Sequence, residues 1–249
     1  MYEQFAGFYD EFTTNVDYER RAAYFDSLIA RYGCGKGILL DLACGTGSLS
    51  FAMEALGYDV IGVDSSEEML DAALEKKIEK QSAAMFLNQD MTALDLFGTV
   101  TATICALDSL NHLDSIEKVK QAFEKVSLFT EPGGVFIFDV NTLYKHTNVL
   151  GNQAFLFENE DCFLAWQNEL CEDNSVNMYL DFFVSQGEVY SRESEFVKEY
   201  YYSDEQLKSA AEQAGFSLCG IFDDLSKQSP GKTSQRKIFV LTKGDICQK

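Results

Sequence analysis

Two carboxylates and a glycine-containing turn are the features of this sequence that could do chemistry. In "LLDLACGTGSLSFAM", residues 39–53, an apolar run carries Asp41 and is followed by Gly45 and Gly47. Glycine lets the chain turn sharply at the end of a strand and lets a ligand lie against bare backbone. Asp64 ends the next apolar run, where a carboxylate can accept hydrogen bonds from both ribose hydroxyls of a nucleoside. The combination predicts a site for a nucleoside-containing ligand.

NAD and S-adenosylmethionine (SAM) both contain such a nucleoside, and three features favour SAM. The dinucleotide fingerprint has a third glycine, whereas this chain has Ser50 in "GTGSLS". The carboxylate of Asp41 would repel a pyrophosphate and would help to hold a cationic ligand. The pattern of the last part of the chain, a helix and two strands, also suits the sheet of methyltransferases.

The elements that must position this turn alternate along the first part of the chain. Apolar, strand-like stretches alternate with amphipathic, helix-like ones, which predicts a parallel sheet covered on both faces, a doubly wound Rossmann-like α/β fold. The expected strands are 38–43, 58–64, 83–90, 101–108 and 133–140, and the expected helices are 2–13, 17–32, 47–56, 65–80 and 114–129.

The pattern changes after about residue 147. Aromatic-rich runs separated by "ENED", "EDNS" and "QGE" predict an antiparallel β meander of about four strands over 148–202, which would cover the acceptor site. A helix at 203–214 and two strands within 203–249 would complete a seven-stranded sheet, mostly parallel with the last strand antiparallel. Residues 1–147 would then hold the N-terminal lid helices and the SAM-binding core.

Composition excludes several classes of protein. The chain has 249 residues, with 40 acidic against 20 basic ones, a formal net charge of −20 that disfavours nucleic acid as a partner. No apolar stretch reaches the roughly 18 residues of a membrane helix, and the first residues do not resemble a signal peptide. We therefore expect a cytoplasmic protein that does not bind a membrane. The seven cysteines form no CxxC pair and there are two histidines, so we expect neither a disulfide nor a metal site.

Several motifs resemble those of class I SAM-dependent methyltransferases. "LLDLACGTG" is similar to the first motif of that superfamily, "VIGVDSS" to the second, "NQDM" to the segment that contacts adenine, and "EPGGVFIFD" to the turn and strand after the fourth helix. The resemblance implies that SAM is the cofactor, with Asp41, Gly45 and Gly47 along its methionine part, Asp64 at the ribose, and Asp90 and Met91 at the adenine. The full set of implied cofactor-binding residues is Arg20, Asp41, Ala43, Gly45, Gly47, Asp64, Ser65, Asp90 and Met91.

Three shorter stretches resemble the branch that contains the glycine and amino-sugar N-methyltransferases. "RRAAY" is similar to a segment whose arginine binds the SAM carboxylate, which implies that role for Arg20. "LDSLNHL" at 107–113 resembles a substrate-facing loop, and "FAGFYDEF" resembles a lid that carries a tyrosine, matched here by Tyr9.

Methyl transfer from a sulfonium is an in-line displacement, so the protein must chiefly orient the acceptor and exclude water. An ammonium or hydroxyl acceptor must also lose a proton, and His112 is a candidate base because an imidazole titrates near neutral pH. His112 could instead only shape the pocket. Asp108 could steer an amine by its charge or cap the next turn, and Tyr9 could close the site or pack in the core.

The sequence therefore predicts a SAM-dependent methyltransferase that acts on a small molecule, with an amine favoured over a hydroxyl as acceptor. Two alternatives stay open at this point: methylation of RNA or protein, and a SAM-binding sensor or partner module without catalytic activity. The acceptor's identity and the oligomeric state are not determined by these patterns.

Overall fold

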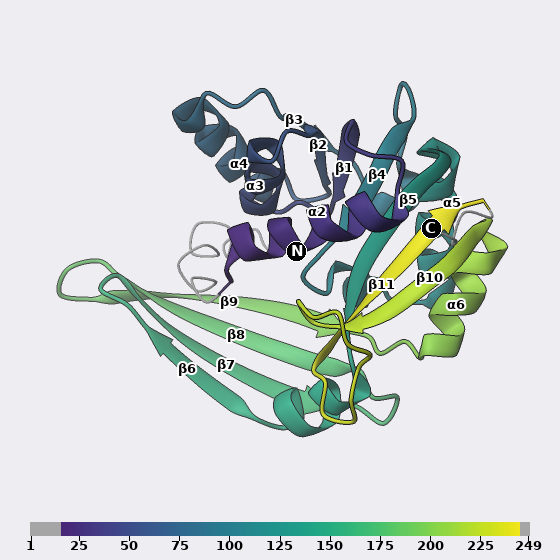
Figure 1. The fold of residues 1–249 in the computed structure, drawn as a ribbon. Helices are drawn as coiled ribbons and strands as arrows, with labels where there is room; N and C mark the ends of the chain where they lie inside the picture. The colour runs from purple at the N-terminus through teal and green to yellow at the C-terminus, as the bar shows by residue number, and fades with distance from the viewer. Residues whose placement is uncertain (1–15, 245–249) are drawn as a thin grey trace.

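The core of the protein is a seven-stranded sheet in the order β10-β11-β5-β4-β1-β2-β3 (Figure 1). The computed structural model describes residues 16–244, so the expected helix at 2–13 and Tyr9 lie outside the described residues. The strands are β1 (Ile38–Leu42), β2 (Asp59–Asp64), β3 (Met85–Asn88), β4 (Val100–Cys105), β5 (Thr130–Asn141), β10 (Phe216–Asp223) and β11 (Arg236–Lys243).

The directions of these strands confirm the predicted sheet. Strands β1 to β5 pair in parallel, whereas β11 pairs antiparallel with both β5 and β10. Because the carboxyl ends of β1, β2 and β4 meet at one edge of the sheet, the residues that follow them come together there.

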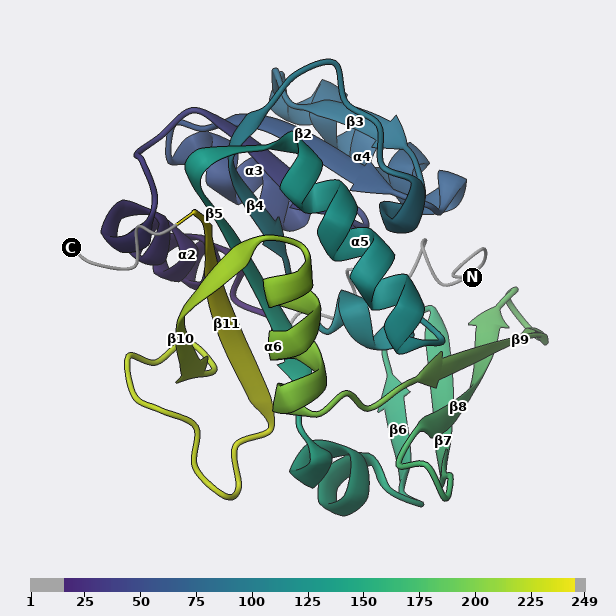
Figure 2. The ribbon, with the colours of Figure 1, turned by 90° about the vertical axis from the view of Figure 1, so that its right-hand side faces the viewer.

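Helices cover both faces of the sheet (Figure 2). On one face, α2 (Tyr18–Tyr32) and α3 (Ser48–Ala55) pack through an apolar cluster that includes Phe25 and Met53. On the other, α5 (Ile116–Phe129) and α6 (Asp204–Gln213) pack through a second cluster. In that cluster the rings of Phe138 and Phe239 stack with centroids 5.0 Å apart. Helix α4 (Glu67–Lys80) lies against β2 and β3.

A second, four-stranded antiparallel sheet follows β5, in the order β6-β7-β8-β9, and confirms the predicted meander. Its strands are β6 (Ala154–Glu158), β7 (Cys162–Leu170), β8 (Val176–Ser185) and β9 (Tyr190–Glu199), and they share their own buried cluster around Phe182. A π-helix, η3 (Lys145–Leu150), precedes the sheet and was not predicted.

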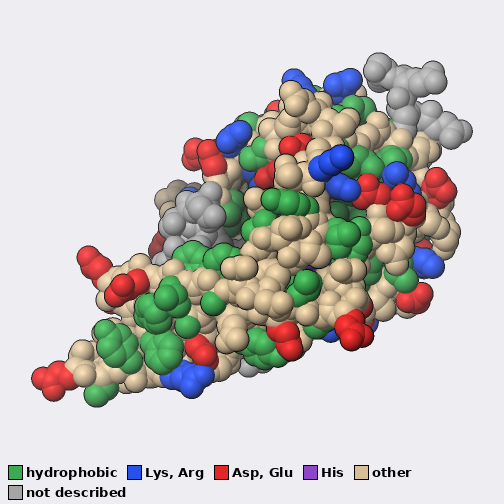
Figure 3. Space-filling view, turned by 90° about the horizontal axis from the view of Figure 1, so that it is seen from below, with side chains coloured by type: hydrophobic (Ala, Val, Ile, Leu, Met, Phe, Trp, Pro, Cys, Tyr) green, Lys and Arg blue, Asp and Glu red, His purple; other side chains and the backbone are tan. Residues whose placement is uncertain are grey.

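The underside of this sheet carries apolar side chains (Figure 3). The exposed large hydrophobic residues of β6, β8 and β9 and of the turn between β8 and β9 are Leu156, Phe157, Tyr179, Val189, Tyr190 and Phe196. The rings of Tyr179 and Phe196 are 5.4 Å apart.

One cysteine departs from the sequence expectation. Cys219, on β10, is disulfide-bonded, so the prediction that the chain forms no disulfide is wrong. The fold decides which distant cysteines meet, and their spacing along the chain does not show it. Cys34, Cys44, Cys105, Cys162 and Cys171 are free thiols. Within residues 16–244, no helix is both long and apolar enough to span a bilayer.

Candidate active site

The turn after β1 adopts left-handed backbone at Ala43, Gly45 and Gly47, with φ of 59°, 55° and 74°. The two glycines are needed for different reasons. A Cβ on Gly47 would lie 2.9 Å from Cζ of Phe86, so the first turn of α3 packs directly on a ring from β3. A Cβ on Gly45 would meet nothing within 4 Å, because Gly45 faces a cavity. Gly47 therefore permits the packing, and Gly45 leaves backbone open to a ligand.

Asp64, at the end of β2, is hydrogen-bonded to this turn. Its Oδ2 accepts the backbone N–H of Gly45 at 2.8 Å, and its Oδ1 accepts that of Ser66 at 2.9 Å. Burial raises the pKa of Asp64, and these backbone donors work against the rise. Each oxygen keeps a lone pair, so the carboxylate can still accept a bond from a ligand hydroxyl.

Asp41 is almost fully buried beneath the same turn, 1% exposed. The hydroxyl of Ser50 donates a hydrogen bond to its Oδ2 at 2.6 Å. Burial raises the pKa of Asp41 to about 7, with a smaller contribution from the charge of Asp64, while Ser50 opposes the rise. A cation in the cavity would therefore favour the ionised form of this carboxyl.

Two adjoining cavities lie over the carboxyl ends of β1, β2 and β4, and His112 borders both of them. The first cavity is lined by Asp41 and Gly45, and the second by Asp90. Shared walls come from Ala43, Asp64, Ser65, Met91, Ser109 and His112. Sequence reasoning did not identify Tyr18, Cys44, Thr46, Ser48, Ser66, Met69 or Leu107, which also line the first cavity. Most of them are immediate neighbours of motif residues, so their position in the sequence could have indicated that they line the cavity.

Two residues assigned to the cofactor do not line either cavity. Gly47 packs under the turn, as described above. Arg20 is exposed on α2, where its backbone N–H bonds to the capping carboxylate of Asp17. Its neighbour Arg21 is buried instead and pairs with Asp139 and Asp224. The assignment of Arg20 to the SAM carboxylate stays a prediction.

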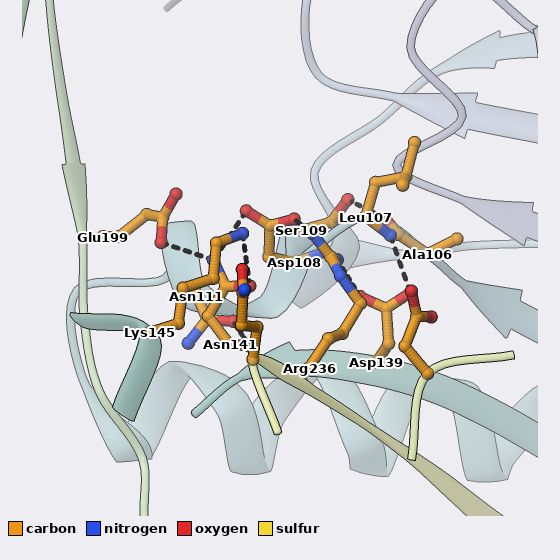
Figure 4. A network of polar contacts seen from close by, with 12 residues as sticks. Ala106, Leu107, Asp108, Ser109, Asn111, Asp139, Asn141, Lys145, Glu199 and Arg236 are labelled. Carbon is orange, nitrogen blue, oxygen red and sulfur yellow. Dashed lines mark hydrogen bonds and ion pairs between the residues drawn. The ribbon is translucent and has the colours of Figure 1, made fainter. Parts of the chain in front are cut away.

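The loop after β4 is held in an unusual conformation beside the cavities. Leu107 and Asp108 are consecutive left-handed residues, with φ of 57° and 55°, which costs energy for any residue with a Cβ. The buried carboxylate of Asp139, at the end of β5, accepts both of their backbone N–H groups, at 2.9 and 2.7 Å (Figure 4). The loop then enters the short 3-10 helix η2 (Ser109–His112).

Arg236, from β11, completes this arrangement by pairing with both Asp139 and Asp108 (Figure 4). The second oxygen of Asp108 accepts an N–H of Asn141 at 2.9 Å. Burial disfavours the charge of Asp108, but Arg236 and Lys145 outweigh it and hold the pKa of that carboxyl well below its usual range. Asp108 is thus ionised, its charge is offset by Arg236, and it lines neither cavity, although its neighbours Leu107 and Ser109 line the first.

His112 and Glu199 lie next to this charge. One ring nitrogen of His112 and one carboxylate oxygen each of Asp108 and Glu199 lie within 4.8 Å of one another. Burial lowers the pKa of His112, although Asp108 works against this, so the ring is neutral near pH 7. Three such donor atoms could hold a metal ion, and that the site uses no metal stays a prediction.

Comparison with known proteins identifies the cofactor. A family model described as a methyltransferase domain matches residues 39–134. The chain is 32% identical over 245 residues to a protein of Bacillus subtilis (strain 168) that is named "Putative methyltransferase YqeM", and the match covers 98% of this chain and 97% of that protein. It also matches a solved S-adenosylmethionine-dependent methyltransferase from Clostridium acetobutylicum ATCC 824, with 31% identity, a TM-score of 0.88 and coverage of 98% and 99% of the two chains.

An amino-sugar enzyme is also among the relatives. The dTDP-3-amino-3,6-dideoxy-alpha-D-glucopyranose N,N-dimethyltransferase of Streptomyces fradiae is 30% identical over 124 residues, which cover 49% of this chain and 47% of that protein. The resemblance stated from the motifs is confirmed, and so is SAM as the cofactor. The alternative of a binding module without activity is set aside. This chain belongs to the class I SAM-dependent methyltransferases.

Proposed function

We propose that this methyltransferase transfers its methyl group to the amine of a small molecule. The observation that carries the proposal is His112, which borders both cavities and has a ring nitrogen within 4.8 Å of a carboxyl oxygen each of Asp108 and Glu199. Carboxyl oxygens and a neutral imidazole can accept hydrogen bonds from an ammonium group, and an ionised carboxylate offers no donor to a phosphate or a carboxylate. The amino-sugar enzyme among the relatives, whose name specifies an amine, supports the same acceptor class.

The proposed cofactor contacts follow from the lining of the two cavities. Asp64 would accept the ribose hydroxyls, Asp90 and Met91 would contact the adenine in the second cavity, and Asp41 would face the cationic part beneath the turn. When bound, SAM supplies an activated methyl group. The protein residues hold it in place and exclude water from the acceptor side.

The acceptor side would be covered by the four-stranded sheet. Strand β9 reaches η2 directly, because Tyr200, just past its end, donates its backbone N–H to the carbonyl of Asn111 at 2.7 Å. The side-chain amide of Asn111 returns a bond to the carbonyl of Tyr200 at 2.8 Å. The cover is thus anchored at the loop that carries Asp108 and His112, where insertions set specificity in folds of this kind.

A panel of matched acceptors tests the proposal. Purified protein and methyl-labelled SAM are incubated with amino sugars, with glycine and other small amines, and with the hydroxyl analogue of each. We expect label to enter the amines and not the analogues. Incorporation into hydroxyl compounds only would overturn the choice of amine.

A second assay tests the choice of a small molecule over RNA or protein. A cell extract is split by size into a small-molecule fraction and a macromolecular fraction, and each is offered as acceptor. The net charge of −20 disfavours a nucleic acid substrate, so we expect label in the small-molecule fraction. Incorporation confined to the macromolecular fraction would contradict the proposal.

A further inference from the structure

Asp139, near the end of β5, is a fully buried carboxylate, 0% exposed, that joins three other parts of the chain. Each of its oxygens has the same kinds of partner, one backbone N–H of the loop after β4 and one arginine. Oδ2 accepts from Leu107 at 2.9 Å and lies 3.5 Å from Arg21 of α2. Oδ1 accepts from Asp108 at 2.7 Å and pairs with Arg236 of β11 (Figure 4). Any rotation of this carboxylate would therefore break bonds to both the loop and an arginine.

The sheet fixes the position of this carboxylate. Strand β5 lies between β4 and β11, and Asp139 is paired with Ile238 of β11. Leu107 and Asp108, in contrast, have left-handed backbone, which residues with a Cβ adopt only where their surroundings hold them. The loop thus takes its conformation from a rigid strand and not from its own residue types.

This conformation decides which side chains of the loop reach the cavities. Leu107 and Ser109 line the first cavity, and His112 borders both. Asp108, between the first two, lines neither. Strands β4 and β2 flank β1 in the sheet, so the loop lies on the other side of the turn after β1 from Asp64. With the ribose at Asp64, as proposed above, the loop is the wall against which an acceptor would lie.

We propose that Asp139 is a positioning residue for methyl transfer, which holds the loop so that the acceptor lies in line with the methyl group of SAM. Asp139 lines neither cavity and acts only through the backbone of Leu107 and Asp108. The rate of such a displacement depends steeply on geometry, and a misplacement of about 1 Å can cost about 100-fold. This inference rests on the proposed placement of SAM and holds for an amine or a hydroxyl acceptor alike.

The test compares Asp139→Asn with the wild type, using a compound of the acceptor panel that the wild type methylates. Asparagine keeps the size of the side chain but has one acceptor oxygen, so one of the two loop N–H groups loses its partner. Calorimetric titration gives the affinity for SAM and the number of SAM-binding sites, and each rate is divided by that number. We expect kcat/KM for the acceptor to fall about 100-fold per site. The affinity for SAM should change by about threefold or less.

Asp224→Asn is the matched control. Asp224 is the other carboxylate that binds Arg21, at 3.0 and 3.2 Å from its two terminal nitrogens, and its side chain is 35% exposed. The same substitution there removes a charge from the same group of ion pairs but leaves the bonds to Leu107 and Asp108 in place. We expect the wild-type kcat/KM from this variant.

Arg236→Lys decides the question if Asp139→Asn does not fold and binds no SAM. This variant keeps the Asp139 carboxylate and both of its bonds to the loop. A lysine ammonium group, however, cannot replace the planar guanidinium fork that pairs with Asp139 and Asp108 together. Because one charged contact is lost, kcat/KM per site should fall by about tenfold.

Three results would overturn the role of Asp139. The first is a wild-type kcat/KM per SAM-binding site in Asp139→Asn, or in Arg236→Lys if the former does not fold. The second is a loss confined to the number of SAM-binding sites, which is what a purely structural role gives. The third is an equal fall in Asp224→Asn, which would assign the effect to the charge of the group and not to the loop.

The proposed function is tested separately by two other results. A wild type that methylates hydroxyl compounds and no amine refutes the amine acceptor, and Asp139→Asn is then compared on the hydroxyl compound. An Asp64→Ala variant that binds SAM as tightly as the wild type refutes the proposed placement of SAM, whatever the effect of Asp139→Asn.

Discussion

Replacement of Asp41 by asparagine is expected to stabilise the protein without SAM and to weaken the binding of SAM. Asp41 is buried, and its pKa of about 7 lies well above its ordinary value of 3.8. Because the folded state binds the proton more tightly than the unfolded one, the stabilisation is complete below about pH 4 and is lost as pH rises through about 7. The corresponding free energy is about 4 kcal/mol.

The asparagine variant has no carboxyl to ionise at this position, and its amide oxygen can still accept from the hydroxyl of Ser50. The difference in free energy of unfolding between the variant and the wild type should therefore increase by about 4 kcal/mol, in favour of the variant, from about pH 4 to about pH 8. Denaturant titrations at several pH values measure the difference. Asp17→Asn, which makes the same substitution at the exposed cap of α2, is the matched control for the change of residue type.

The same substitution should have the opposite effect on SAM. A cation in the cavity favours the ionised carboxyl. With a pKa of about 7, about a tenth of Asp41 is ionised at pH 6 and about nine-tenths at pH 8. The affinity of the wild type for SAM should therefore rise about tenfold over that range. Calorimetry in two buffers of different ionisation enthalpy should show about half a proton more released by the wild type than by Asp41→Asn at about pH 7. Equal proton release, or equal pH dependence of the two affinities, would refute this account of Asp41.

Three further predictions concern residues around the same site. Asp64→Ala should weaken SAM binding about 100-fold or more, as measured by calorimetry, because two hydrogen bonds to a charged group are lost; a change below tenfold would place the ribose elsewhere. Asp139→Asn keeps a single acceptor oxygen for the N–H groups of Leu107 and Asp108, so the free energy of unfolding, measured with denaturant, should fall by about 2 kcal/mol or more. An unchanged free energy of unfolding would mean that the loop does not depend on this carboxylate. Gly47→Ala should lower the free energy of unfolding by about 1–2 kcal/mol or more, because the backbone is left-handed there and the new Cβ would lie against Phe86. Gly98→Ala, where a Cβ would lie in open space, should leave stability unchanged. Equal thermal midpoints for the two variants would contradict the packing argument.

The core could be predicted from sequence because its strands are apolar almost throughout. A strand such as β5, buried over "GGVFIFDVN", differs plainly from the amphipathic helices that flank it. The starts of two helices could also be predicted from sequence, because Asp17 and Ser203 are residue types that cap helices. Each accepts the backbone N–H of the third residue of its helix. These are local effects, and local sequence is enough to show them.

The polar network of the site depends on contacts between residues far apart in the chain. Arg236 meets Asp108 across 128 residues, and a single arginine at the start of a strand gives no sign that it will be buried. Glu199 lies in a strand of alternating exposure, where an acid is usually exposed to solvent. One signal was present: Arg21 shares a helix face with the buried Phe25, Leu28 and Ile29, whereas Arg20 does not.

The four-stranded sheet leaves the core once, after β5, returns once, before α6, and encloses a hydrophobic cluster of its own. It can therefore diverge, or be exchanged between relatives, while the methyl-donor pocket keeps its shape. One contact must be kept in such an exchange, because the side-chain amide of Asn141 in the core donates a hydrogen bond to Glu199 of the sheet. A transplanted segment that lacks an acid at that junction would leave a buried amide hydrogen without its acceptor, so the sheet can be exchanged only together with this acid.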